Sequence, residues 1–251
     1  MAIGEAPLKA AVVLQLGPVP VTQPVVATWA IMALLVLVSW LGMRRASATD
    51  GNGGGSGLQR ALEVLVEAMQ GQLAEILPQG GWRYLPVVGT LFLYVVSANL
   101  SAILPEVKPP TASLETTAAL ALVVFFSVHA YGLAARGPWG YLRRYVTPSP
   151  FLLPLNMLAD VTRTFSLMVR LFGNMMSHEF VIAIVVFLAG FLVPVPFLLL
   201  GVLIGVIQAY IFAMLSAVYI GAAVEGEGGP PPPAAMGKQG TEAGYDDGHK
   251  P

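Results

Sequence analysis

The sequence contains no cysteine and little charge. Among its 251 residues only 11% are Asp, Glu, Lys or Arg, and the formal net charge is −1. The lack of cysteine excludes disulfides, thiolate metal sites and cysteine nucleophiles. A net charge near zero argues against nucleic acid as a partner. Because 56% of the residues are hydrophobic, the chain is too apolar for a water-soluble domain of this length, and a membrane protein is favoured.

Five apolar segments are long enough to cross a bilayer, for which about 20 residues are needed. The predicted spans cover about 25–43, 84–104, 116–135, 151–190 and 196–224. Residues 58–77 place apolar side chains at helical spacing among charged ones, which predicts an amphipathic helix on the membrane surface. We therefore expect an all-α multi-pass protein whose membrane domain covers residues 25–224.

The two ends of the chain lie outside this membrane domain. Residues 1–24 lack the basic leader and cleavage site of a signal peptide, so we expect a retained extramembrane segment. Residues 225–251 combine a proline run with mixed charge, which predicts a disordered cytoplasmic tail.

The distribution of basic residues predicts the orientation. With the N-terminus outside, the cytoplasmic side receives Arg44, Arg45, Arg60, Arg83, Arg136, Arg143 and Arg144, and the outer side only Lys9 and Lys108. This asymmetry is the one that the positive-inside rule expects. The C-terminus is then cytoplasmic.

The last two spans are longer than a perpendicular crossing requires. As a helix, residues 151–190 would approach about 60 Å, against roughly 30 Å of hydrocarbon. Their apolar content disfavours a projection into water, so we expect a steeply tilted helical hairpin that presents one broad face to a neighbour.

Arg170 lies in the middle of the fourth span. Its guanidinium stays protonated at ordinary pH. At membrane depth such a charge costs several kcal/mol, and it usually faces a protein interior or a water-filled path. No acidic residue lies three or four positions away, so a partner on its own helix is not available. A salt bridge to another helix is the simple structural alternative.

Polar side chains form a narrow stripe around Arg170. At about 100° per residue, the side chains within about 40° of it are Asn156, Arg163, Ser166, Asn174 and Ser177. Asp160 and His178 lie near the edge of the stripe, whereas Glu179 projects about 180° away. Two polar regions on different sides of an arginine indicate two aqueous compartments that it keeps apart. Gln208 on the last span could hydrogen-bond the arginine.

Several of these residues also have simpler explanations. Asp160 and Arg163 are three positions apart and could form only an intrahelical ion pair. His178 could be a hydrogen-bonded core histidine. The dipeptide His178-Glu179 begins like a zinc-protease motif, but Ile182 stands where the second histidine would fall, so no metal site is predicted. His129, on the third span, is expected to be structural or interfacial.

Two motifs resemble subunit a of F-type rotary ATP synthases. The first is Ser166-Leu-Met-Val-Arg170-Leu-Phe-Gly-Asn174-Met, with Glu179 nine residues beyond the arginine, and the second is Gln208-Ala-Tyr-Ile-Phe-Ala-Met-Leu-Ser-Ala-Val-Tyr-Ile220. The runs Pro154-Leu-Asn156-Met-Leu-Ala-Asp160-Val-Thr162 and Tyr219-Ile-Gly-Ala look most like the chloroplast and cyanobacterial branch. The match is dense from about 147 to 224 and continues more weakly back to 25.

The resemblance implies a stationary subunit that is not an enzyme by itself and holds no cofactor. It would provide two half-channels that pass H⁺ or Na⁺ to and from carboxylates of a rotating c-ring. The implied partners are the c-ring, b-type peripheral stalk subunits, the soluble ATPase sector and membrane lipid, in a bacterial inner membrane. The coupling ion stays open, because the c subunit coordinates it.

The resemblance also implies roles for individual residues. The implied ion pathway comprises Arg170, Glu179, His178, Asn174, Gln208, Ser166, Asp160, Arg163 and Asn156. Arg170 would pair with the unloaded rotor carboxylate and prevent direct leakage. The His178 and Glu179 end of the helix would line the outer path, and the Asp160 end would lie nearer the cytoplasm.

The chain departs from the family pattern at a few positions. Many bacterial members have a small residue in place of His178 and a histidine in place of Gly201, which suggests an exchange across the helix pair. Gly201-x-x-x-Gly205 is by itself a helix-packing motif. Thr164 replaces a common proline, and Ala102 replaces a frequent aspartate.

The sequence is less consistent with two other classes of protein. A stand-alone secondary transporter or channel would favour inverted repeats or broken helices at mid-membrane, and the sequence has no convincing repeat. An intramembrane hydrolase is disfavoured because cysteine, a paired-aspartate motif and a complete metal motif are lacking.

Overall fold

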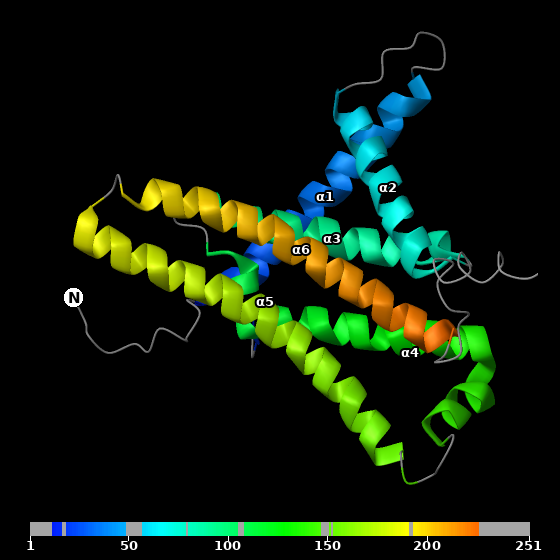
Figure 1. Ribbon diagram of the computed structural model, residues 1–251. Helices are drawn as coiled ribbons and strands as arrows, with labels where there is room; N and C mark the ends of the chain where they lie inside the picture. Colours follow the sequence, from blue (N-terminus) through cyan, green and yellow to red (C-terminus); the bar gives the residue numbers. More distant parts are fainter. Residues whose placement is uncertain are drawn as a thin grey trace, which may run out of the picture.

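The computed structural model describes residues 12–16, 19–48, 57–78, 80–104, 108–146, 151, 153–190 and 193–225 (Figure 1). Its strands are β1 (Val12–Leu16) and β2 (Val19–Thr22). Its α-helices are α1 (Gln23–Ala48), α2 (Gly57–Ile76), α3 (Leu85–Leu100), α4 (Leu114–Val146), α5 (Leu153–Ala189) and α6 (Pro194–Glu225). Three short 3₁₀ turns, η1 (Gly81–Arg83), η2 (Ser101–Ile103) and η3 (Pro110–Ala112), connect them. The predicted tail, apart from residue 225, and residues 1–11 of the predicted N-terminal segment lie outside the described residues.

Five of these helices are long and apolar enough to cross a membrane. The candidate spans are Gln23–Leu41, Leu85–Ile103, Leu114–Arg143, Leu153–Leu188 and Pro194–Val224. The predicted architecture of five long apolar helices is therefore confirmed, and the two short strands lie before the first of them. At about 1.5 Å per residue, the 37 residues of α5 extend over roughly 55 Å, which is longer than a perpendicular crossing needs.

The chain before α1 contains a short antiparallel hairpin that the sequence analysis did not predict. Leu16 pairs with Val19 and Gln15 with Pro20, and an irregularity lies between Val12 and Leu14. Both strands are rich in valine, a residue that favours extended backbone. The N-terminal segment therefore includes regular structure immediately before the first span.

The helix of the third span continues past the predicted end at residue 135. Gly137 interrupts it with φ 70° and ψ 164°, and Pro138 follows. Glycine adopts this positive φ without a Cβ clash, and proline fixes its own φ and removes an amide donor. The chain bends at this point and then resumes a helix, which carries Tyr141 and Tyr145 back toward α5.

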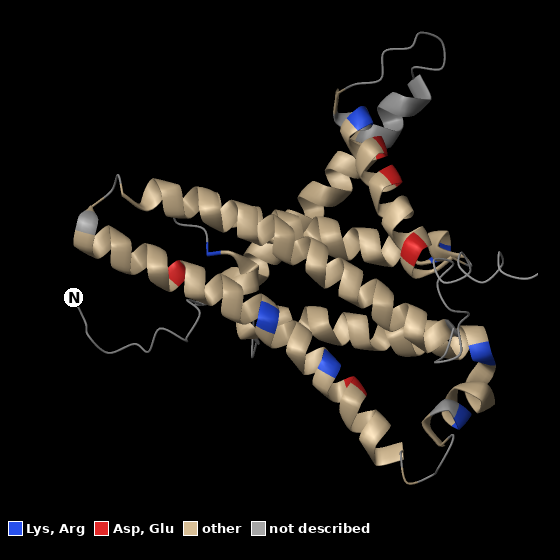
Figure 2. Ribbon diagram, in the orientation of Figure 1, with Lys and Arg blue, Asp and Glu red and all other residues tan. Residues whose placement is uncertain are grey.

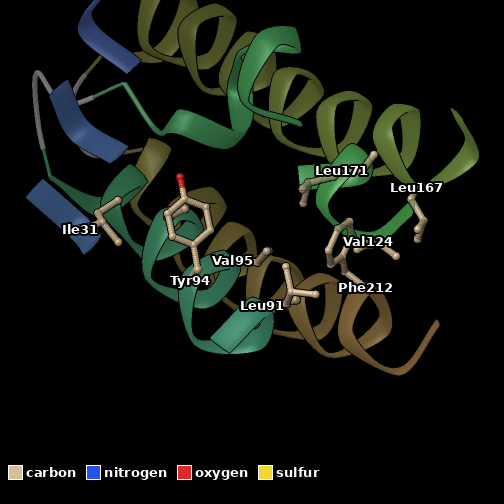
Figure 3. Close-up of a cluster of buried hydrophobic side chains, with 11 residues drawn as sticks. Ile31, Leu91, Tyr94, Val95, Val124, Leu167, Leu171 and Phe212 are labelled. Atoms are coloured by element: carbon tan, nitrogen blue, oxygen red, sulfur yellow. The ribbon is translucent and has the colours of Figure 1, made fainter. Parts of the chain in front are cut away.

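The helices α3, α4, α5 and α6 meet in one apolar cluster, which also receives Ile31 from α1 (Figure 3). Its large buried side chains are Leu91, Val95, Val124, Leu167, Leu171 and Phe212. In Figure 1, α3 lies alongside α6, whereas α5 and α6 diverge from their common turn and α4 lies against both. The cluster occupies the middle of the bundle, at the level of residues 167–171 on α5.

Helix α2 is amphipathic in the way that its sequence predicts. Its buried Met69 and Leu73, with Leu77 just beyond its end, belong to a second apolar cluster that includes residues 213, 217 and 220 of α6. The charged residues on α2, Arg60, Glu63, Glu67 and Glu75, are all exposed. The position of α2 on a membrane surface stays a prediction.

Candidate functional site

Helix α5 carries charged residues along most of its length. They are Asp160, Arg163, Arg170 and Glu179, whereas α3 has no charged residue and α6 has only its last, Glu225. Helix α4 has four charged residues as well, Glu115 near its start and Arg136, Arg143 and Arg144 toward its end. Figure 2 shows the contrast between α5 and the uncharged α3 and α6. The charges within the middle of the bundle therefore lie on α5.

Arg170 is exposed and has no partner among the described residues. Neither a hydrogen bond nor an ion pair joins its guanidinium to any described side chain or carbonyl. Its neighbours Phe165 and Val169 are exposed apolar residues, and Ser166 is exposed as well. The alternative of a salt bridge between helices is therefore not found in the described part of the chain. Among the described residues, Arg170 is therefore an unpaired charge on an exposed, mainly apolar face of α5.

On the side of Arg170 toward the start of α5, polar residues form the Asp160 cluster: Tyr141, Tyr145, Asn156, Asp160 and Arg163. Tyr145 donates its hydroxyl proton to Asp160 Oδ2 at 2.6 Å, and Arg163 Nη1 lies 3.4 Å from Asp160 Oδ1. The possible intrahelical pair between Asp160 and Arg163 is thus present, although Arg163 is 45% exposed. Asn156 Nδ2 donates to the Tyr145 carbonyl at 3.4 Å.

The tyrosines of this cluster form a directed chain of hydrogen bonds. Tyr145 has a single hydroxyl proton and gives it to Asp160, so the 3.0 Å contact with Tyr141 uses the proton of Tyr141. Burial, and then the hydrogen bond to Asp160, raise the pKa of Tyr145 above its usual range. Tyr145 therefore stays protonated and remains a hydrogen-bond donor to Asp160.

On the other side of Arg170 lies a second group of polar residues. His178 places its imidazole directly against Gly201 of α6, in the space that a Cβ at Gly201 would occupy. Asn174 and Glu179 are half-buried near the same end of α5. Lys108, in the segment before η3, acts electrostatically on Glu179.

A buried hydrogen-bond chain lies one helical turn further along α6. Thr111 donates to Asn99 Oδ1 at 2.7 Å, and Asn99 Nδ2 donates to the carbonyl of Gly205 at 2.8 Å. Both glycines of the predicted packing motif thus accommodate a polar side chain, His178 at Gly201 and Asn99 at Gly205. The motif brings α5 and α3 against α6, and it does so through polar groups. Sequence reasoning assigned no role to Asn99 or Thr111; an asparagine in an otherwise apolar run was the available signal.

The two polar groups are separated by the apolar cluster of Figure 3. Between Arg163 and Asn174, the inner face of α5 presents Leu167 and Leu171, which pack with Phe212 and are at most 1% exposed. Such a close-packed layer excludes water. The two polar groups therefore do not connect through the interior.

The predicted hydrogen bond between Gln208 and Arg170 is not present in the described structure. Gln208 is 8% exposed, and its Nε2 has no hydrogen-bond partner among the described residues. Of the predicted stripe, Arg163, Ser166 and Arg170 are exposed, whereas Asn156 and Asn174 are half-buried. The helical wheel thus predicted a common side of α5 but not the packing of each residue on it.

Comparison with known proteins identifies the family. The family model for the ATP synthase A chain matches residues 25–221. "ATP synthase subunit a 2" of Bradyrhizobium sp. (strain BTAi1) is 49% identical over 219 residues, which cover 87% of this chain and 96% of that protein. "ATP synthase subunit a 2" of Pelobacter propionicus is 45% identical over 210 residues, covering 84% and 90%. The protein of the same name from Acaryochloris marina is 44% identical over 209 residues, covering 83% and 88%.

These matches cover most of the chain, including the helix that carries Arg170, and their identities are high enough to show the family. The chain belongs to the ATP synthase A chain family, the non-catalytic, proton-conducting stator subunits of F-type ATP synthases.

Proposed function

We propose that Arg170 is the charge that separates two proton half-channels and pairs with the ionised carboxylate of a passing c subunit. The observation that carries this proposal is its exposure on an apolar face without a partner among the described residues. An arginine at mid-membrane costs about 2.5–3.5 kcal/mol on insertion scales. A carboxylate supplied from outside the chain would offset this cost.

The open face of α5 and α6 is the surface that we assign to the c-ring. Apolar side chains such as Val169, Leu203 and Ile207 are exposed on it. A protonated rotor carboxylate can cross such a surface, because it is neutral. Beside Arg170 the ionised form is favoured, so a proton would be released before the carboxylate passes the arginine.

We assign the two groups of polar residues to the two half-channels. His178, Glu179 and Asn174 would line the outer path, and Asn156, Asp160 and Arg163 the cytoplasmic path. Ser166, which is exposed on α5, and the buried Gln208, whose Nε2 has no partner among the described residues, would complete the path. The buried layer around Leu171 supports this division, because it leaves no polar connection between the two groups.

The orientation follows from the distribution of charge. We place the N-terminus outside and the C-terminus in the cytoplasm of a bacterial inner membrane. The arginines of the chain from 44 to 83 and those at the far end of α4 would then be cytoplasmic. In this arrangement residues 25–224 form the membrane domain, α2 lies on the cytoplasmic surface, and α5 and α6 form a tilted hairpin. The b-type stalk subunits, the soluble ATPase sector and lipid would complete its surroundings.

We further infer that the chain is closest to the chloroplast and cyanobacterial branch of its family. The support is the pattern Pro154-Leu-Asn156-Met-Leu-Ala-Asp160-Val-Thr162 together with Tyr219-Ile-Gly-Ala. A phylogenetic tree of subunit a sequences tests this assignment, and a position outside that branch would refute it.

Replacement of Arg170 by alanine tests the central assignment. In inverted membrane vesicles that carry the whole complex, Arg170→Ala should abolish proton-driven ATP synthesis and increase passive proton permeability, because the charge barrier is lost. Arg60→Ala, which removes an exposed arginine of α2, is the matched control and should leave synthesis unchanged. Co-purification of the c-ring with each variant verifies assembly.

The proposal is contradicted if the complex with Arg170→Ala assembles and still makes ATP at a rate comparable to that of the Arg60→Ala complex. Arg170 is then not the barrier.

A further inference from the structure

A small cavity with both apolar and polar lining residues lies between α4, α5 and α6, next to the Asp160 cluster. Its volume is about 20 Å³. A cavity needs about 10–15 Å³ of this kind of volume to hold one water molecule, together with two to four polar partners. The cavity therefore has room for a single water.

The polar partners come from three helices. His129 of α4, Asp160, Arg163 and Thr164 of α5, and Tyr219 of α6 all line the cavity. Arg163 also lies over the ring of Tyr219, with its Cζ 5.8 Å from the ring centre. Donors and acceptors thus surround the space, and the apolar side chains that close it belong to α4.

His129 supplies the imidazole of this lining, a group that can both accept and donate a proton. Its Nδ1 lies 2.8 Å from the carbonyl of Phe125. A carbonyl only accepts hydrogen bonds, so Nδ1 carries the proton and Nε2 of the neutral ring has a free lone pair. The ring is held in place by Phe125, 4.1 Å away between centres, and by Tyr141.

We propose that this cavity is a one-water proton site and that His129 is a proton-carrying residue of the cytoplasmic path. This inference rests on the proposed function, which places Asp160 and Arg163 on that path. The cavity water receives a proton and passes it to Nε2, which makes an imidazolium. Nε2 then returns the proton to the cavity water, which hands it on along the path, and the neutral Nδ1–H form is restored.

The other groups around the cavity suit this task. Arg163 is permanently positive and disfavours a lasting imidazolium, so the proton would be passed on. Asp160 is held by Tyr145 and by Arg163 and would orient the water. The hydroxyl of Thr164 donates to the Asp160 carbonyl at 3.0 Å, so its oxygen retains acceptor capacity toward the cavity.

The decisive variant is His129→Asn. The amide nitrogen of asparagine can keep the hydrogen bond to the Phe125 carbonyl, but asparagine has no group equivalent to Nε2 that takes up a proton. The measurement is passive proton flux through the membrane sector in inverted vesicles, after removal of the soluble sector, driven by a potassium diffusion potential. The pH is varied on the cytoplasmic face and on the other face separately.

We expect His129→Asn to lower the flux by at least about tenfold and to weaken its dependence on cytoplasmic pH, with the dependence on the other face unchanged. Asp160, Arg163, Tyr141 and Tyr219, the other charged or titratable groups around His129, are present in both proteins. Ser127→Ala is the matched control on α4, because Ser127 is not part of the lining, and it should behave as wild type.

A wild-type flux and pH profile in His129→Asn would overturn the proposal and reduce His129 to a structural residue. If that complex does not assemble, His129→Gln provides the same two measurements, since it also lacks a titratable group. Arg170→Ala is tested in parallel to separate the two hypotheses. If only the His129 variants leave the flux unchanged, the proposed function still stands. Retained ATP synthesis in Arg170→Ala would refute that function itself.

Discussion

The contact between His178 and Gly201 allows a quantitative test of how α5 and α6 fit together. Replacement of Gly201 by alanine adds one methyl group, and that group would occupy the position of the His178 imidazole. The ring must move, or the two helices must separate. Overpacking of this kind costs about 1–3 kcal/mol.

The cost should depend entirely on the histidine. In a protein that already carries His178→Ala, the space beside Gly201 is empty and the added methyl group is harmless. A double-mutant cycle should therefore give a coupling energy of about 1–3 kcal/mol between the two positions. This coupling energy corresponds to a change of roughly 5- to 150-fold in the equilibrium constant between the native helix packing and a displaced one.

The assay is the initial rate of ATP-driven proton pumping by inverted vesicles, divided by the amount of assembled complex. Gly201→Ala alone should reduce this rate strongly, and the same change in the His178→Ala background should reduce it little further. If the effects of the two single changes are simply additive, the histidine does not occupy the space that the structure assigns to it.

The same geometry applies to the exchange of residues within the family. Gly201→His alone would place two imidazoles in one space, whereas Gly201→His combined with His178→Gly leaves a single imidazole between the helices. The double variant should therefore pump faster than Gly201→His alone and at least as fast as His178→Gly alone. A double variant that is much worse than His178→Gly would refute the idea that the two positions are interchangeable.

Three further changes test the support around the site. Asn99→Leu would leave the Thr111 hydroxyl and the Gly205 carbonyl without partners, at about 1–3 kcal/mol each, and should lower the temperature at which the solubilised complex loses this subunit. Gly137→Ala forces a side chain to adopt a φ of 70°, which should cost more than about 1 kcal/mol, measured in the same thermal assay; an unchanged temperature would argue against the bend. Phe212→Ala opens the buried layer and costs about 3–5 kcal/mol; it should raise passive proton leakage, and a tight membrane would contradict the assigned barrier.

Local patterns in the sequence predicted the helices and part of the site. Hydropathy located all five long apolar helices, and the three-residue spacing predicted the ion pair between Asp160 and Arg163. The lack of an acid three or four positions from Arg170 predicted that its own helix offers no partner. These features depend on neighbours within one or two helical turns, so periodicity is sufficient to find them.

The contacts between helices were not predictable in this way. Asn99 bonds to a carbonyl 106 positions away, and Tyr145 reaches Asp160 only because the chain bends at Gly137. A sequence pattern places a residue on one side of a helix but does not say which residue of another helix faces it. For the same reason the sequence pattern indicates only a packing role for Gly201. Its relation to the His178 imidazole is suggested only by the family resemblance.

The proposed separation of the half-channels requires two barriers, because protons have two routes past the middle of the bundle. Inside the protein, the layer of Leu167, Leu171 and Phe212 excludes the water along which protons move. That layer does not cover the open face of α5, where a rotor carboxylate would pass and could carry a proton directly from one polar group to the other. On this face only a fixed charge is effective, since Arg170 favours the ionised carboxylate and so discharges any proton before the crossing. An apolar layer inside and an unpaired arginine outside therefore block different routes, and loss of either one should uncouple proton flow from rotation.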